Sequence, residues 1–78
     1  MIDPKDIFTE AIKMQAQRII LIHNHPSGDP KPSKEDILLT NRVREASMLL
    51  GISFLDHVII GNNNYESVFA IMRKKGLF

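Results

Sequence analysis

The 78 residues of the chain suffice for one small domain and leave no room for a second. Ten lysines and arginines against nine aspartates and glutamates give a net charge of +1, which excludes a nucleic-acid or membrane binder held mainly by charge. The chain has no cysteine, so disulfides and cysteine zinc sites are excluded, and metal ligands must come from His, Asp and Glu.

The first predicted element is an amphipathic helix. Asp3 suits its N-cap, and Pro4 suits its first position because the missing N–H would have had no partner inside the helix. Helical spacing continues as far as Gln15, through Ile7, Phe8, Ala11 and Ile12. Residues 18–22 are short, apolar and mostly β-branched, which predicts a strand buried on both faces and continued by His23–His25.

A stiff loop and a second helix are predicted next. Prolines and a glycine break regular structure over residues 26–32. Ser33 and Asp36 then have the spacing of a capping box, in which the serine hydroxyl accepts from the Asp36 N–H, and Gly51 suits the end of the helix. The predicted apolar stripe of this helix is Ile37, Leu39, Val43, Ala46 and Leu50, widened by Leu38 and Leu49.

Residues 52–61 are β-branched and aromatic and predict a second strand, which ends in a turn at Asn62–Asn64. Residues 65–68 are predicted to pair back through that turn, and residues 69–75 to form a terminal helix that ends at Gly76. A strand, a helix and a strand in this order predict an α/β sheet with a right-handed crossover.

Four residues between the first strand and the second helix have the chemistry of a metal centre. Residues two apart on a strand point to one face, so the imidazoles of His23 and His25 can meet one ion. Asp36 is the natural third ligand, which leaves the open fourth position of a catalytic zinc site, where a water would have a pKa of about 7. Ser33, one turn earlier, could hydrogen-bond the oxyanion formed on attack.

Each of these residues also has an ordinary structural reading. A single histidine near a strand end is usually a loop or core residue, Asp36 alone would be a first-turn carboxylate, and Ser33 alone would be an N-cap. Their convergence in one segment favours the metal centre. His57 has two readings as well: a satisfied core histidine on the face of Leu55 and Ile59, or a residue that supports the metal ligands from behind.

The spacing HxH, seven residues, then SxxD matches the JAMM (MPN+) metalloprotease motif. With HNHPSGDPxPSxxD and the later LDHVIIG, essentially the whole chain resembles the bacterial RadC-like family, which carries the label of a DNA repair protein. The resemblance implies a zinc-dependent hydrolase acting on a peptide or isopeptide substrate. His23, His25 and Asp36 would be the zinc ligands and Ser33 the oxyanion helper. It also implies a JAMM fold, related to that of cytidine deaminase, with a sheet flanked by helices.

One departure concerns the general base, which in this family is a glutamate upstream of the first helix. The chain begins too late to contain it, and Glu10, Glu35 and Glu66 are better explained as surface carboxylates. We therefore expect residues 1–78 to be a single, partial JAMM domain, truncated at its N-terminal side. Loss of upstream strands would expose an apolar sheet edge and favour self-association.

Two alternatives to the hydrolase stay open. The absent glutamate favours a zinc-stabilised interaction module without catalytic activity, and only the family label supports a DNA-binding accessory module. No apolar run approaches the roughly 20 residues that cross a bilayer, and the N-terminus lacks the regions of a signal peptide. We expect a soluble, cytoplasmic protein with no membrane partner.

Overall fold

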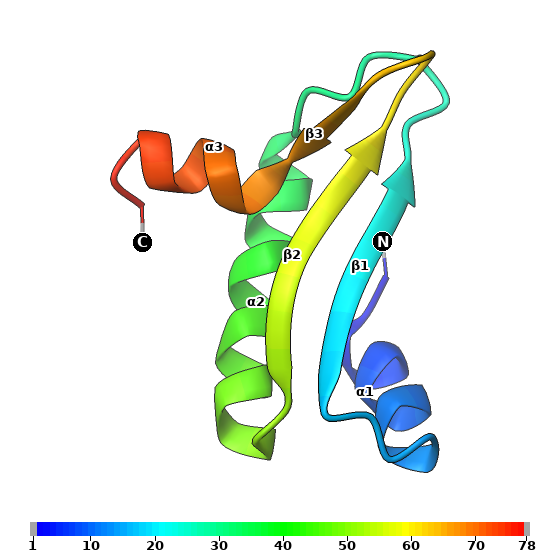
Figure 1. The fold of residues 1–78 in the computed structure, drawn as a ribbon, viewed down its shortest axis with the longest axis vertical. Coiled ribbons are helices and arrows are strands. Elements are labelled where there is room, and N and C mark those ends of the chain that lie inside the picture. The colour runs from blue at the N-terminus through cyan, green and yellow to red at the C-terminus, as the bar shows by residue number, and fades with distance from the viewer. Residues whose placement is uncertain (1, 78) are drawn as a thin grey trace.

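A computed structural model describes residues 2–77 as a three-stranded sheet with three helices (Figure 1). The elements in chain order are α1 (Pro4–Lys13), β1 (Arg18–Asn24), α2 (Lys34–Leu50), β2 (Ser53–Ile60), β3 (Tyr65–Ser67) and α3 (Val68–Lys74). The predicted α/β class is confirmed, and so is the order of elements. Whether further strands precede this part of the fold stays a prediction. In the described chain, none of the helices is long and apolar enough to span a bilayer.

The sheet has the order β1-β2-β3, with β1 and β2 parallel and β2 and β3 antiparallel. α2 connects the two parallel strands, as the strand, helix, strand pattern predicts. In the register of the parallel pair, Leu21 lies beside His57 and His23 beside Ile59. The register shifts between Ile19 and Ile20, so that Leu55 has no partner in β1. Strict alternation along the strand predicts that Leu55 and His57 share a face, and this irregularity separates them.

The helix ends follow local sequence signals. Asp3 caps α1 by accepting a hydrogen bond from the Lys5 N–H (2.9 Å), and Gly51 ends α2 in a left-handed conformation with a φ of 70°. α1 ends at Lys13, so the prediction that its spacing continues to Gln15 is wrong. Gln15 itself has a φ of 53°, which no helix accommodates, and the chain turns there towards β1.

All three helices pack on one face of the sheet. One buried cluster joins α1, α2 and the start of β2, and a second joins β2 to α3; together they contain Phe8, Ala11, Leu39, Val43, Ile52, Ile59, Val68 and Met72. Toward the sheet α2 presents Asp36, Leu39, Thr40, Val43 and Ser47. The predicted stripe is therefore wrong at Leu38, Leu49 and Leu50, which are exposed. At 3.6 residues per turn, Leu38 and Leu49 lie on the side of the helix opposite Asp36.

The other face of the sheet is open in the described chain. Ile20 and Ile22 are 53% and 70% exposed, and Ile60 is 41% exposed. The prediction that the first strand is buried on both faces is wrong, because no helix of residues 2–77 covers this second face. β1 also forms one edge of the described sheet, so an apolar edge is present (Figure 1).

Candidate metal centre

The fold brings His23, His25 and Asp36 together, as their spacing predicts. His23 lies near the end of β1, and His25 follows it, tied to β2 by its N–H, which donates to the Ile60 carbonyl (3.0 Å). The Asp36 side chain reaches them from the first turn of α2. His23 Nδ1 lies 3.0 Å from Asp36 Oδ1, and His25 Nε2 lies 2.9 Å from Asp36 Oδ2. Each carboxylate oxygen therefore faces one imidazole.

Ser33 forms the predicted capping box with Asp36. The serine hydroxyl accepts from the Asp36 N–H (3.2 Å) and donates to Asp36 Oδ2 (2.9 Å), while the Ser33 N–H donates to the same oxygen (2.8 Å). Asp36 is only 3% exposed. Burial alone raises the pKa of its carboxyl, but the hydrogen bonds from Ser33, with His25 and His23 beside it, bring that pKa below its ordinary value of 3.8. The carboxylate is thus held ionised.

The hydrogen bonds of His25 show that its site suits a cation. Its Nδ1 lies 2.9 Å from the Asp29 carbonyl oxygen, which only accepts, so Nδ1 must carry a hydrogen. Its Nε2 faces the carboxylate of Asp36, which also only accepts. Nε2 therefore either carries a second hydrogen or shares a metal ion with that carboxylate. A ligating histidine whose other N–H donates to a backbone carbonyl is a recurrent feature of metal centres.

The loop that carries the Asp29 carbonyl is locked against the turn between β2 and β3. Gly28 has a φ of 85°, and its carbonyl accepts from the Asn62 N–H (2.9 Å). A Cβ on Gly28 would lie 2.5 Å from the side-chain nitrogen, Nδ2, of Asn62. A Cβ on Gly61 would overlap the Gly28 carbonyl oxygen and lie 2.8 Å from Pro30. Both glycines permit the close approach of the two loops.

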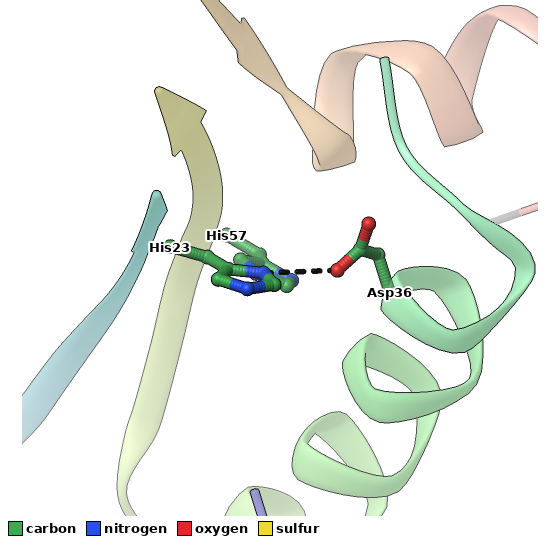
Figure 2. A group of neighbouring side chains, drawn as sticks. All are labelled: His23, Asp36 and His57. Atoms are coloured by element: carbon green, nitrogen blue, oxygen red, sulfur yellow. Dashed lines mark hydrogen bonds and ion pairs between the residues drawn. The ribbon is translucent and has the colours of Figure 1, made fainter. Parts of the chain in front are cut away.

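His57 is part of the same cluster. Its side chain lies in β2 and is 1% exposed, and its ring stacks on that of His23, with centroids 6.0 Å apart. Ligand atoms of His23, Asp36 and His57 all lie within 4.8 Å of one another, so the three residues can hold a metal ion (Figure 2). The structure confirms that His57 is a buried histidine and places it beside His23; that it supports the metal ligands stays a prediction. Its position beside Leu21 depends on the shifted register, which the sequence does not reveal.

Burial lowers the pKa of His57 below its ordinary value of 6.5, and the neighbouring His23 and His25 lower it further, against the opposing influence of Asp36 and Asp56. This shift favours the neutral form of His57, which is the form that binds a metal.

A cavity of about 480 Å³ opens beside the cluster, and His23 and Asp36 form part of its wall with Ile2, Glu35 and Leu39. Glu35 is exposed, as a surface carboxylate would be. It nevertheless shares this cavity with the two predicted ligands. The cavity provides space for a substrate group next to the candidate metal position.

Comparison with known proteins identifies the family of the chain. The RadC-like JAB domain family matches residues 1–77. The chain belongs to this family. The RadC-like chain is 58% identical over 69 residues to a UPF0758 protein of Carboxydothermus hydrogenoformans, and 54% identical over 76 residues to one of Clostridium botulinum strain Hall. These matches cover 88% and 97% of this chain but 30% and 32% of the relatives, so it spans about a third of their length.

The donor set suits the metal that the family implies. Two imidazoles and one carboxylate are borderline to hard donors of the kind that zinc takes, and cysteine is absent. The buried, ionised Asp36 supplies negative charge, and the Asp29 carbonyl orients one imidazole. The residues present therefore fit a divalent cation.

We predict that Gly61→Ala weakens zinc binding about tenfold or more, because the new methyl group pushes the loop and its Asp29 carbonyl away from His25. Competition with a chromophoric chelator measures the affinity. Gly76→Ala is the matched control: its φ of 69° makes alanine strained, but nothing lies within 4 Å of the added carbon. Equal affinities in the two variants would show that the loop contact does not position the site.

A second prediction concerns the pH dependence of stability without metal. Because the pKa of His57 is lower in the fold, the unfolded chain binds more protons just below pH 6.5, and stability should fall as the pH is lowered through this value. Below the ordinary pKa of Asp36, 3.8, stability should fall again for the same reason. Urea unfolding in a chelator at several pH values measures this, and His57→Gln should flatten the first step. An unchanged slope in that variant would contradict the prediction.

Proposed function

We propose that this chain is the zinc-binding part of a JAMM-type hydrolase that cleaves peptide or isopeptide bonds. The arrangement of His25 carries the proposal. Its Nδ1 is committed to the Asp29 carbonyl, and its Nε2 faces an ionised, buried carboxylate at 2.9 Å. A hydrogen on Nε2 or a metal ion between the two groups satisfies this pair, and we assign it to a metal ion. Membership of the RadC-like JAB family supports zinc as that cation.

His23, His25 and Asp36 would hold the ion. Zinc in such a site supplies a Lewis acid that polarises a carbonyl and lowers the pKa of a water to about 7. The protein contributes the orientation of each ligand. Ser33 fixes the Asp36 carboxylate with two hydrogen bonds, and Asp29 fixes the ring of His25.

Ser33 is also suited to the proposed role of oxyanion helper. Its backbone N–H holds Asp36 Oδ2 at 2.8 Å whether or not the hydroxyl does so as well. The hydroxyl hydrogen can therefore rotate from Asp36 towards a developing oxyanion while the ligand stays in place. Ser33 is exposed, so a substrate can reach it. In this proposal the serine donates a hydrogen bond and does not act as a nucleophile.

Hydrolysis by this mechanism also needs a general base. The residues that match the family's pattern do not include the glutamate that the resemblance implies. Glu35 is the described glutamate that shares the cavity with His23 and Asp36, and it is the candidate to assist proton transfer in this chain. General acid or base assistance is worth about 10² to 10⁴ in rate. Catalysis is therefore the part of the proposal that depends on residues outside the matched motif.

The small size of the chain supports a second candidate function, a zinc-stabilised interaction module. A chain of 78 residues has a small core, and a metal that joins β1 to α2 would contribute directly to its folding. Zinc binding is common to both candidates, and hydrolysis separates them.

We predict that the purified chain binds zinc and that Asp36→Asn lowers the affinity at least about 100-fold, because the buried ligand loses its charge. Asp29→Asn is the matched control: it removes a carboxylate from the same loop but keeps the backbone carbonyl that orients His25. Chelator competition and metal analysis measure both. Failure of the wild-type chain to bind zinc would sink both candidates.

Hydrolysis of a fluorogenic isopeptide-linked lysine substrate decides between the two candidates. The test compares this chain, its Glu35→Gln variant and a longer version with the upstream region of the relatives. We expect the longer version to be about 100-fold faster or more. If both lengths bind zinc and neither hydrolyses the substrate, the interaction module is the better description.

We also propose that the edge of β1 pairs with a second copy of the chain. The edge residues from Ile19 to Ile22 include no proline and no charge to oppose pairing, and an edge strand is self-complementary in antiparallel register. Pairing centred on Leu21 would place Ile20 of one copy opposite Ile22 of the other. Both isoleucines are more than half exposed in the single chain, so pairing would bury them.

Ile22→Lys is therefore predicted to shift the chain from dimer to monomer in sedimentation velocity, at little cost to the stability of the single chain, because residue 22 is already exposed. Leu49→Lys is the matched control, since Leu49 is 88% exposed on the outer side of α2. A monomeric wild-type chain, or equal dissociation in both variants, would contradict pairing through β1.

A further inference from the structure

His57 is the buried group at the site that the HxH and SxxD spacing does not include. It lies in β2, beside Leu21 of β1, and its side chain is 1% exposed. Its ring is nearly parallel to that of His23, at an interplanar angle of 19°. Figure 2 shows the two rings together, opposite the Asp36 carboxylate.

The hydrogen bonds of Thr40 determine which nitrogen of His57 carries the hydrogen. Thr40 Oγ1 lies 2.9 Å from the Asp36 backbone carbonyl and 2.9 Å from His57 Nδ1. A carbonyl oxygen only accepts, so the single hydroxyl hydrogen of Thr40 goes to Asp36. The bond to His57 then requires Nδ1 to donate. Both contacts form together only in the tautomer with hydrogen on Nδ1, which leaves a lone pair on Nε2.

This lone pair has no hydrogen-bond partner within residues 2–77. Every fully buried side-chain nitrogen and oxygen in that range has a partner. Nε2 has none, so it is not fully enclosed, and water or a small ion can reach it. A ring nitrogen of His57 lies within 4.8 Å of a carboxylate oxygen of Asp36, which also offers only lone pairs. Because Nδ1 is engaged by Thr40, Nε2 is the nitrogen left to bind a cation. An imidazole lone pair kept near a carboxylate, with no donor between them, is an arrangement that a cation satisfies.

We propose that His57 Nε2 is a further ligand of the metal centre and that Thr40 is its positioning residue. The proposal rests on the zinc binding of the proposed function and not on hydrolysis. With His23 and Asp36, whose ligand atoms lie within 4.8 Å of its own, and with His25, which faces the same carboxylate, it would make a centre of three imidazoles and one carboxylate. Zinc can expand to five-coordinate, so a fourth protein ligand is compatible with a hydrolase as well as with an interaction module.

Thr40 links this ligand to the backbone of another. Its hydroxyl bonds to the carbonyl of Asp36, whose side chain is itself a ligand, and to the ring of His57 on the neighbouring strand. α2 and β2 are thereby joined both through the threonine and through the ion. Metal binding would then hold the helix against both parallel strands, not only against β1.

The first test needs no variant. Long-range ¹H–¹⁵N correlation spectra of the metal-free chain identify the tautomer of His57, which should carry its hydrogen on Nδ1. Addition of one equivalent of zinc should move the Nε2 resonance strongly. A hydrogen on Nε2, or an Nε2 resonance that zinc leaves unmoved while those of His23 and His25 respond, overturns the proposal.

The second test uses paired substitutions. Thr40→Val keeps the shape of the side chain but removes the hydroxyl, whereas Thr40→Ser keeps the hydroxyl. We expect Thr40→Val to redistribute the tautomers of His57 and to weaken zinc binding about 10- to 100-fold, and Thr40→Ser to restore both. A merely structural role for Thr40 would change stability and leave the tautomer and the zinc affinity unaltered.

His57→Gln separates this proposal from the proposed function. Loss of the ligand should weaken zinc binding at least about 100-fold, measured by chelator competition on protein whose folding is checked by amide spectra. Wild-type affinity in folded His57→Gln, with affinity lost in Asp36→Asn, overturns the role of His57 and leaves the zinc site standing. Absence of zinc binding in the wild type overturns both. If His57→Gln does not fold, the spectra of the wild-type chain decide.

Discussion

The buried carboxylate of Asp36 is the group on which the rest of the site depends. It accepts two hydrogen bonds from Ser33, which closes the capping box of α2, and each of its oxygens faces an imidazole of the segment that ends β1. The same side chain therefore caps the start of a helix and joins that helix to a strand. Because its pKa lies below the ordinary value, the group stays charged in a place where an unpaired charge would be costly.

The loop between β1 and α2 matters because it presents a backbone carbonyl as well as side chains. Asp29 orients His25 through its carbonyl oxygen, and that oxygen is in place because the loop lies directly on the turn after β2. Glycine at positions 28 and 61 allows this contact, since a side-chain carbon at either would meet the opposite loop. Strand β2 thus supports the centre from two sides, through this turn and through His57.

The proposed metal binding and the proposed catalysis depend on different residues in this RadC-like chain. The candidate ligands and the hydrogen bonds that support them lie within the described chain, and they form a donor set that suits zinc. The general base that the family resemblance implies is not among the matched residues, and the chain covers about a third of its relatives. Zinc binding can be tested on this chain, because its candidate ligands are present. Hydrolysis can be tested on the longer relatives.

Sequence alone determined the local features, because capping and strand alternation act over a few residues. Asp3, Ser33 and Gly51 set helix ends, and the HxH and SxxD spacing identified His23, His25, Ser33 and Asp36 as neighbours. Only the tertiary structure decided which side of α2 is buried, since Leu38 and Leu49 are apolar but turn away once Asp36 faces the sheet. It also decided that β1 has one open face and that His57 joins the site, because both depend on the packing and register of strands distant in sequence.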